Sequence, residues 1–437
     1  MKIRPLFWSS CILIGWVLIL VGISWWQKEQ IVYPLNRDFL RHQVLGDYTY
    51  QASKTGTASA NLGIVYGFLP YWSVDNYQID NTVSHVSYFR LAIDADGNLS
   101  DDGGAHIYES DRMQQIFDQI ERQNIKLEVT FFTSHSDDIY NLVNCEKCQK
   151  RLLDNIAQVV EKDRLDGVNL DLEYLGTLTR GEQQKMTFFL YDLKNMLLEK
   201  FPRTKLSIDV YGGAASMENN LWDWSKIGQI VDRVIVMGYD YRTRRADTPG
   251  SSSPTLSDNI WGGNIWDDII SLERFVESDR IILAVPFYGY AWETTTCDLE
   301  TAKTYPDTGQ TLTYRGAQNM LNNPLSDAVE YWDSSSLTPY LVFTDDGIRS
   351  EQTENEQMQT VAGLPSPLPE SADSDQIETS TGDNGEKRCH IGFFENQRSL
   401  EYKIDLIENL HLGGIAIWAL GYEGEYQQLW ETIDSRF

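Results

Sequence analysis

Positive charge is scarce in this chain of 437 residues, which has 36 lysines and arginines against 64 aspartates and glutamates and a formal net charge of −28. Nucleic acids and anionic lipid head groups are bound through basic patches, so this composition argues against both as partners. A neutral polysaccharide is compatible with an acidic surface. We therefore predict no nucleic-acid partner, whereas the composition does not indicate an oligomeric state.

Cysteine is also scarce, with five residues in the whole chain. Cys145 and Cys148 have no second pair of the same spacing beside them, and a closed zinc site needs four ligands. A local disulfide and two free thiols remain as alternatives for that pair. The sequence also lacks internal repeats, a phosphate-binding loop and a serine triad, so we predict no metal and no cofactor.

The segment Leu6–Trp26 lacks charged residues and is almost wholly apolar. A helix of about 20 residues spans the core of a bilayer. Because Lys2 and Arg4 precede the segment, the positive-inside rule places the N-terminus in the cytoplasm and the rest of the chain outside. The alternative is a cleaved signal peptide, whose apolar region is shorter and ends in small residues, whereas this one ends in Trp25 and Trp26.

We accordingly predict three regions. Residues 1–27 form a cytoplasmic tip and a transmembrane anchor, 28–61 form a polar linker or stalk, and 62–437 form a domain outside the cytoplasm, at the cell surface or in the periplasm. Cys11 lies within the anchor and is expected to stay unpaired. The other four cysteines would then lie in an oxidising compartment.

Short apolar runs recur along residues 62–437, and amphipathic stretches such as 111–123, 149–161 and 182–200 lie between them. Strands that alternate with helices in this way predict an α/β fold, a (β/α)8 barrel. The active site of such a barrel lies at the C-terminal ends of its strands. The eight predicted strands are Ile64–Phe68, Val83–Leu91, Lys126–Phe132, Val168–Leu172, Lys205–Val210, Arg233–Met237, Ile281–Val285 and Gly414–Trp418.

The fourth of these strands has an unusual pattern. Its apolar residues alternate with polar ones, so that one face carries an amide and two carboxylates: Asn169, Asp171 and Glu173. A solvated edge strand is one explanation. An acid–base pair that projects into a cleft explains the pattern better, because a buried carboxylate is costly unless it is paired or neutralised.

The same stretch resembles the D-x-x-D-x-D-x-E motif of glycoside hydrolase family 18, the chitinase-like enzymes. Asp166, Asp171 and Glu173 match, and Asn169 stands where many members have aspartate. The layout is similar to the branch that contains spore-cortex and cell-wall N-acetylglucosaminidases. Four further segments are similar to strand motifs of the family, in the same order: Gly67–Trp72, Met237–Tyr241, Pro286–Tyr290 and Gly413–Trp418.

This resemblance implies a reaction in which the substrate's own 2-acetamido oxygen attacks the anomeric carbon. Glu173 would be the general acid and later the base, with its pKa raised by the neighbouring carboxylate of Asp171. Asp171 would accept a hydrogen bond from the acetamido N–H, and Tyr239 would donate one to the acetamido oxygen. Asp240 would hold the sugar or Glu173, and Trp418 would form the floor beneath the scissile sugar. Further substrate contacts are expected from Asn169, Met237, Tyr241, Trp72 and Trp332.

Two departures from the family pattern bear on this assignment. Asn169 cannot carry charge, but its amide could donate a hydrogen bond to Asp171 and keep that carboxylate ionised. We therefore expect an active enzyme with an altered pH profile. The third-strand S-x-G-G pattern is replaced by Val129–Ser134, which puts a standard chitinase-type cleft in doubt.

The interval between the seventh and eighth strands is longer than one helix requires. Many family members insert a small α+β subdomain there, and the resemblance implies one at about residues 292–392, with strands at 329–332 and 339–344. Within it, residues 350–387 are rich in acidic and small polar residues and are expected to form a disordered loop. Cys297 and Cys389 lie near the two ends of this insertion, so we predict a disulfide between them; two free thiols are the alternative.

The leading hypothesis is a membrane-anchored enzyme that hydrolyses β-1,4-linked N-acetylglucosaminyl bonds in peptidoglycan or chitin-like glycans. The alternative is a non-catalytic, lectin-like protein on the same fold, against which the intact Glu173 and Asp171 argue. An adhesion module would show repeats or extra binding domains, and the sequence shows neither.

Overall fold

The computed structural model describes residues 63–75, 77, 79–217, 219–257, 263–344 and 388–437, which belong to one compact unit, Thr57–Phe437. The predicted anchor (1–27), the linker (28–61) and the acidic loop (350–387) lie outside the described residues. Within the described ranges, no helix is both long and apolar enough to cross a membrane.

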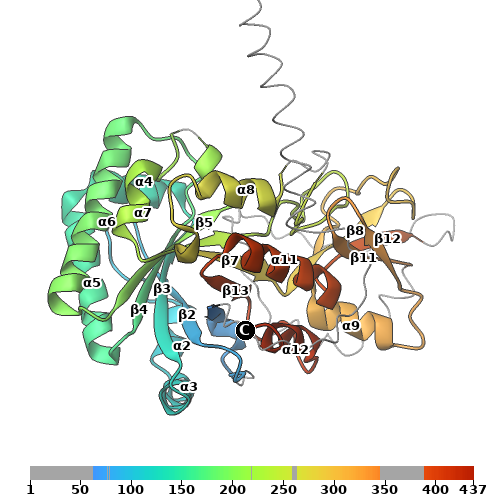
Figure 1. The fold of residues 1–437 in the computed structure, drawn as a ribbon, viewed down its shortest axis with the longest axis horizontal. Helices are drawn as coiled ribbons and strands as arrows, with labels where there is room; N and C mark the ends of the chain where they lie inside the picture. Colours follow the sequence, from blue (N-terminus) through green and yellow to red (C-terminus); the bar gives the residue numbers. More distant parts are fainter. Residues whose placement is uncertain (1–62, 76, 78, 218, 258–262, 345–387) are drawn as a thin grey trace, which may run out of the picture. The chain divides into compact units, whose positions relative to one another are not determined.

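Eight parallel strands close into a barrel (Figure 1), and each of them overlaps one of the eight predicted runs. The predicted (β/α)8 barrel is therefore confirmed. Around the barrel the strands follow the order β1, β13, β7, β6, β5, β4, β3, β2. Their bounds are β1 Ile64–Pro70, β2 His85–Ala92, β3 Lys126–Thr133, β4 Gly167–Leu172, β5 Lys205–Tyr211, β6 Arg233–Met237, β7 Ile281–Pro286 and β13 Gly414–Trp418.

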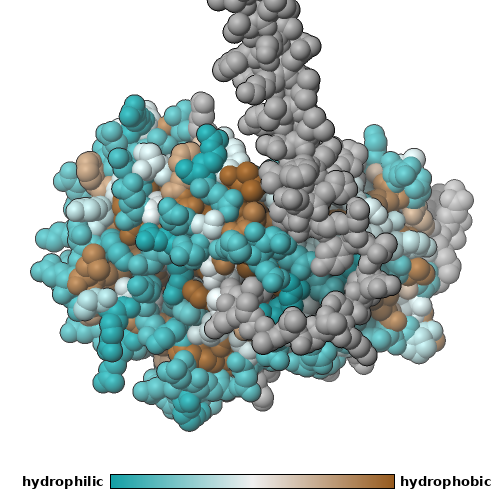
Figure 2. All heavy atoms as spheres, in the orientation of Figure 1, coloured by the Kyte–Doolittle hydropathy of each residue, from teal (hydrophilic) through white to brown (hydrophobic). Residues whose placement is uncertain are grey.

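Helices surround the barrel, with α4 to α7 on the left of Figure 1, α11 near its centre and α12 below α11. Their bounds are α2 Gly103–Tyr108, α3 Asp111–Arg122, α4 Ser136–Asn144, α5 Glu146–Asp163, α6 Arg180–Lys200, α7 Trp224–Ile230, α8 Ile265–Leu272, α11 Gln397–Leu410 and α12 Gln428–Asp434. Short 3-10 turns lie at Tyr71–Ser73, Ala214–Ser216 and Ser278–Arg280. On the face shown in Figure 2, hydrophilic side chains cover most of the described surface and the apolar patches are scattered.

The longest of these helices, α6, begins at a capping box. The Thr179 hydroxyl accepts a hydrogen bond from the backbone N–H of Glu182, and the Glu182 carboxylate accepts one from the backbone N–H of Thr179. This capping box satisfies two backbone donors that a helix start leaves without partners. The helix then buries Phe189, Leu193 and Leu197 at four-residue spacing, which places one apolar face on the barrel.

Between β7 and β13 the chain forms a second, antiparallel sheet of five strands, at the right of Figure 1. Its strand order is β10, β11, β12, β8, β9. The insertion begins earlier than the predicted boundary at about residue 292. Its first strand along the chain, β8, is separated from β7 by Phe287 alone. The elements are β8 Tyr288–Thr294, β9 Gln310–Thr313, α9 Tyr314–Asn322, β10 Val329–Asp333, β11 Thr338–Thr344 and β12 Cys389–Phe393.

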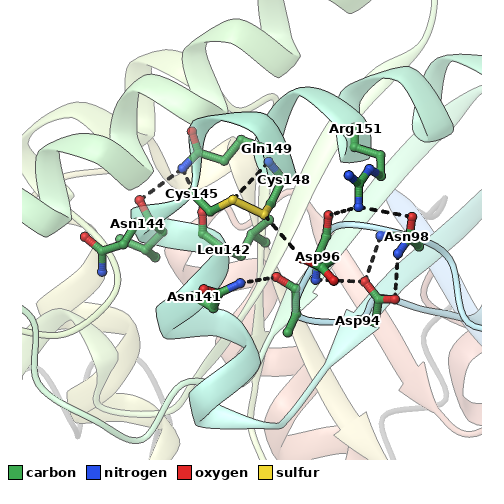
Figure 3. Close-up of a disulfide and its surroundings, with 12 residues drawn as sticks. Asp94, Asp96, Asn98, Asn141, Leu142, Asn144, Cys145, Cys148, Gln149 and Arg151 are labelled. Atoms are coloured by element: carbon green, nitrogen blue, oxygen red, sulfur yellow. Dashed lines mark hydrogen bonds between the residues drawn. A yellow bond between two sulfur atoms is a disulfide. The ribbon is translucent and has the colours of Figure 1, made fainter.

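The part of the chain that the structure describes contains two disulfides. One joins Cys297 to Cys389, with a Cα–Cα distance of 5.4 Å and a sequence separation of 92 residues. The other joins Cys145 to Cys148 at the start of α5, where Figure 3 shows it beside the turn that contains Asp96. The Cys145 sulfur accepts a hydrogen bond from the backbone N–H of Cys148, and the sulfur of Cys148 lies 3.9 Å from an Asp96 carboxylate oxygen.

The two disulfides should differ in what they contribute to stability. In the chain-entropy model a loop of about 90 residues contributes about 4–5 kcal/mol, and a loop of three residues about 1.5–2 kcal/mol. We therefore expect Cys297→Ser/Cys389→Ser to lower the free energy of unfolding by about 3 kcal/mol more than Cys145→Ser/Cys148→Ser does. Chemical denaturation of the full-length variants measures both. Equal losses would show that the long bond does not restrain the unfolded chain.

Candidate active site

Polar side chains gather at the C-terminal ends of three neighbouring strands, β4, β5 and β6. Asp171 on β4 is the register partner of Asp209 on β5, and Tyr211 at the end of β5 is the partner of Met237 at the end of β6. Both aspartates are buried. Adjacent parallel strands thus carry two carboxylates side by side at the end of the barrel where catalytic residues lie in this fold.

Asn169 is fully buried one layer below these carboxylates. Its Nδ2 donates to Asp209 Oδ1 at 2.8 Å and to Ser207 Oγ at 3.0 Å. The expectation that this amide donates to Asp171 is therefore wrong, because both donors of Nδ2 point across to β5 rather than along β4. Asn169 therefore stabilises the ionised form of Asp209 and donates no hydrogen bond to Asp171.

Asp171 is buried without a compensating donor. Its Oδ1 has no hydrogen-bond partner within the described residues. Burial raises the pKa of Asp171, and the nearby charges of Asp209 and Glu173 raise it further. Burial likewise raises the pKa of Asp209, although the hydrogen bond from Asn169 works against that shift. A buried acceptor without a partner is costly in the free protein and is available to a ligand that brings an N–H donor.

Glu173 follows β4 directly and is partly exposed. Burial raises its pKa to about 7; the hydroxyl of Tyr211, which donates to Glu173 Oε2 at 3.1 Å, opposes that shift, and the charge of Asp240 adds to it. The raised pKa comes first from burial, and the charge of Asp240 adds to it. Glu173 and Asp171 also repel each other, since the charge of Glu173 raises the pKa of Asp171. A carboxyl group with this pKa can be protonated near neutrality and can act as a general acid.

Asp240 lies just beyond β6 and connects the barrel to the second sheet. Its Oδ1 accepts hydrogen bonds from Tyr288 Oη at 2.5 Å and Tyr290 Oη at 2.8 Å, and its backbone N–H donates to Ser252 Oγ at 3.1 Å. Its φ of 63° is in the left-handed region, which residues other than glycine rarely adopt. The two tyrosines on β8 therefore hold Asp240 in place beside Glu173.

Tyr239 lies next to this group and packs its ring against Tyr288, with centroids 6.0 Å apart. Burial raises its pKa, and the charges of the four carboxylates around it raise the pKa further: those of Asp209, Asp171, Asp240 and Glu173. The hydroxyl consequently stays protonated at physiological pH. No hydrogen bond to another described residue occupies it, so it is available to donate to a ligand.

Aromatic rings form the apolar part of the site. Trp418 ends β13 and packs edge-on against Phe89 with centroids 4.6 Å apart, and its ring centroid lies 5.8 Å from that of Phe68. It also contacts the apolar cluster of the second sheet, so it lies where barrel and insertion meet. Trp72, in the 3-10 turn that follows β1, contacts Phe89 with centroids 6.2 Å apart.

Two of the predicted contact residues, Tyr241 and Trp332, have other surroundings, whereas Met237 lies beside residues of the site. The Tyr241 hydroxyl donates to Asp268 on α8 at 2.5 Å and packs over Gly212, where any larger side chain would collide with it. Met237 is buried and lines a small recess together with Asp209 and Tyr211.

Trp332 is not brought to the carboxylates at all. Its ring lies under the Arg398 guanidinium, 3.8 Å from the centroid, and beside Tyr402; both belong to α11. Its neighbour Tyr331 occupies the opposite face of β10, since successive residues of a strand alternate. Tyr331 stacks on Tyr340, which stacks on Phe393, with centroids 5.5 and 5.3 Å apart.

Sequence reasoning missed this stack and the two residues of β5, Asp209 and Tyr211. The signal for β5 was present, because Ser207, Asp209 and Tyr211 alternate with apolar residues just as Asn169, Asp171 and Glu173 do. No signal in the sequence chose Tyr331 over Trp332. Within the described ranges, no group of three or more histidine, cysteine or carboxylate side chains is arranged to hold a metal ion.

Comparison with known proteins assigns this chain to a family. The model of the family "Glycosyl hydrolases family 18" matches residues 64–423, far more than half of the chain. The chain belongs to this family. It is a glycoside hydrolase. The raised pKa of Glu173, close to buried aspartates, fits the acid catalysis that this chemistry needs.

Other members of family 18 are distant in sequence. A cortical fragment-lytic enzyme of Bacillus subtilis is 22% identical over 305 residues, which cover 68% of this chain and 55% of that protein. A probable di-N-acetylchitobiase of Dictyostelium discoideum is 22% identical over 326 residues, 68% of this chain and 72% of that protein. The structure of a family 18 chitinase from Cycas revoluta in complex with (GlcNAc)3 aligns with a TM-score of 0.65 and 16% identity, covering 85% of this chain and 99% of that one.

The Asn169–Asp209 contact leads to a test in this family 18 enzyme. In Asn169→Asp, a carboxyl group would lie 2.8 Å from Asp209 in place of the amide, so the two groups would share a proton and the pKa of the pair would rise. A raised carboxyl pKa favours the folded state at low pH and costs stability as pH increases. We expect an active variant with a shifted pH–rate profile whose melting temperature, relative to the parent protein, is lower at pH 8 than at pH 5. Identical profiles and a constant difference would show that residue 169 is not coupled to Asp209.

Proposed function

We propose that this enzyme hydrolyses β-1,4-linked N-acetylglucosaminyl bonds in peptidoglycan or a chitin-like glycan, with retention of configuration and with assistance from the substrate. The observation that carries the proposal is the placement of Glu173, whose pKa burial raises to about 7, beside Asp171, whose buried Oδ1 lacks a partner among the described residues. Most retaining enzymes need a second carboxylate as nucleophile; here the substrate's acetamido oxygen takes that part.

In the first step Glu173 gives its proton to the glycosidic oxygen, and the bond from that oxygen to the anomeric carbon breaks. The acetamido carbonyl oxygen attacks the same carbon and forms a cyclic oxazolinium ion. Asp171 accepts the acetamido N–H and stabilises the positive charge, while the Tyr239 hydroxyl orients the acetamido oxygen. In the second step the Glu173 carboxylate removes a proton from water, and the water oxygen adds to the anomeric carbon. The bond from that carbon to the acetamido oxygen breaks, so the oxazolinium ring opens and the acetamido group is restored.

The surroundings support these roles. Asp171 and Tyr239 each offer a hydrogen-bonding atom that no described residue occupies, one an acceptor and the other a donor. An acetamido group presents the complementary pair, an N–H donor and a carbonyl acceptor. Trp418 supplies the flat apolar surface that a sugar ring needs beneath its C–H bonds.

We also propose that the catalytic domain works outside the cytoplasm, tethered by the N-terminal segment. The apolar segment Leu6–Trp26, which Lys2 and Arg4 precede, supports this location. The disulfides Cys145–Cys148 and Cys297–Cys389 support it independently, since such bonds persist in oxidising compartments.

A panel of substrates tests the proposal. The full-length protein should release products from chitooligosaccharides or purified sacculi and should leave cello-oligosaccharides, which lack the 2-acetamido group, uncut. A thiazoline that mimics the oxazolinium ion should inhibit it. Equal hydrolysis of cello-oligosaccharides would refute assistance by the substrate, and sugar binding without any product would favour a lectin-like role.

A further inference from the structure

A second cavity lies at the other end of the barrel, where the strands begin. It has a volume of about 560 Å³, and the loops that lead from α5 into β4 and from α6 into β5 form its walls. In Figure 1 these elements lie together at the left of the molecule. Because Glu173 and Asp171 lie at the opposite strand ends, the cavity is separate from the active site.

The lining of this cavity is cationic in a protein that is otherwise strongly acidic. Six basic side chains line it, against the three carboxylates of Glu128, Glu161 and Asp166. The chain as a whole has a net charge of −28. A local surplus of positive charge inside a recess concentrates anions there, since the low-dielectric walls focus the field. The basic residues are Lys126, Arg164, Lys200, Arg203, Lys205 and Arg233.

Three of the six cations already have carboxylate partners. Arg233 Nη1 donates to the buried Glu128 at 2.7 Å, and Lys126 Nζ lies 3.1 Å from Asp166 Oδ1. Lys205 lies 3.6 Å from an oxygen of Asp232, whose other oxygen binds Lys194. In each of these three pairs a carboxylate offsets the positive charge of the basic side chain.

The other three cations, Arg164, Lys200 and Arg203, are exposed at the rim. Among the described residues no carboxylate forms an ion pair with any of them. Two are arginines, whose planar guanidinium groups match the oxygens of phosphate in a bidentate manner. Together with the exposed carboxylate of Glu161 in the same lining, these three cations leave a net charge of +2. One carboxylate cannot neutralise that charge, whereas a phosphate monoester carries about −1.5 to −2 near neutrality and each unit of a phosphodiester chain adds a negative charge.

We propose that this cavity binds a phosphate-bearing ligand through Arg164, Lys200 and Arg203. The ligand is either a free multivalent phosphate or a chain of phosphodiesters, and the two share the chemistry that the rim recognises. The site would hold the enzyme on an anionic matrix without involving the residues that cleave glycans.

Isothermal titration of the full-length protein with tripolyphosphate and with a glycerol-phosphate oligomer tests this. We expect saturable binding of at least one of them, weakened by salt, and about tenfold or more weaker in Lys200→Glu/Arg203→Glu, because attraction becomes repulsion. Stronger binding of the oligomer assigns the polymer as the ligand, and stronger binding of tripolyphosphate assigns the free anion. Arg203→Lys keeps the charge and should cost only a few-fold.

The matched control is Lys150→Glu/Lys226→Glu, which changes the net charge equally at exposed positions that do not line the cavity. It should bind phosphate as the parent protein does. The proposal is overturned if neither phosphate ligand binds, if polyglutamate of equal charge binds as tightly, or if the control loses as much affinity. Glycan hydrolysis should be unchanged in both double variants, so the failure of this site and the failure of the proposed catalytic function can be distinguished.

Discussion

Glu173→Gln is expected to reduce the rate of glycan hydrolysis by about 10²–10⁴-fold or more, because it removes the proton that the leaving oxygen requires. The substitution preserves the shape of the side chain, and the glutamine oxygen can still accept the Tyr211 hydroxyl that now binds Glu173 at 3.1 Å. Folding and sugar binding should therefore be retained. Steady-state kinetics with N-acetylated oligosaccharides measures the loss, and calorimetric titration with the same sugars measures the retained binding.

The matched control is Glu199→Gln, which makes the same chemical change at an exposed position of α6. It should leave both kcat and KM unchanged. Equal turnover by the parent protein and Glu173→Gln would remove Glu173 from the mechanism. A simultaneous loss of sugar binding and thermal stability would mean instead that Glu173 has a structural role.

The pKa of Glu173 also predicts the pH dependence of the parent enzyme. The general acid must be protonated in the free enzyme, and burial with the charge of Asp240 raises its pKa to about 7. The value of kcat/KM should therefore fall on the alkaline side with an apparent pKa near 7. In Tyr211→Phe the hydrogen bond that favours the ionised form is lost, so this alkaline limb should move to higher pH.

The sequence predicted the strands well because alternation along a strand is a local property. All eight predicted runs overlap barrel strands, and Arg233–Met237 and Gly414–Trp418 have the same bounds in the structure. The same alternation singled out Asp171 on β4 and Glu173 directly after it. The sequence could not predict contacts between strands, such as that of Asn169 with Asp209, because these depend on which strands are neighbours and in which register.

The aromatic residues of the insertion also show that the sequence alone does not predict contacts between strands. Trp332 and Tyr331 are adjacent in sequence, and both are aromatic. A shift of one residue moves a side chain to the other face of a strand. Pairing with β11 places Tyr331 in the stack with Tyr340 and leaves Trp332 against Arg398 of α11. Only the register of the sheet decides which of the two side chains joins the stack with Tyr340 and Phe393.

Asp171→Asn is expected to lower the rate about 10²–10³-fold while it makes the folded protein more stable at alkaline pH. The rate falls because the amide cannot stabilise the positive charge of the oxazolinium ion as a carboxylate does. The stability increases because burial and the charges of Asp209 and Glu173 raise the pKa of Asp171, so its ionisation costs free energy in the folded state.

The pH at which the gain appears follows from the raised pKa of Asp171. Below the pKa of an aspartate in the unfolded chain, near 4, the side chain is protonated in both states and the substitution changes little. Between that pH and the raised pKa of the folded state, the parent protein loses about 1.4 kcal/mol of stability for each step of one in pH, and the variant does not. The difference in melting temperature between variant and parent should therefore widen in favour of the variant from pH 4 to pH 8.

Asp209→Asn is the matched control, since Asp209 is equally buried and its pKa is raised by burial too. It should also gain stability at high pH, offset in part by a weaker hydrogen bond from Asn169. Its loss of rate should be smaller, because Asn169 already occupies an oxygen of Asp209, whereas Asp171 leaves one open. If Asp171→Asn kept the full rate, or if it were less stable than the parent protein at every pH, Asp171 would be a structural residue and the buried acceptor would have another purpose. A loss of rate combined with a gain of stability that grows with pH is the result expected of a functional carboxyl group that the fold buries at a cost.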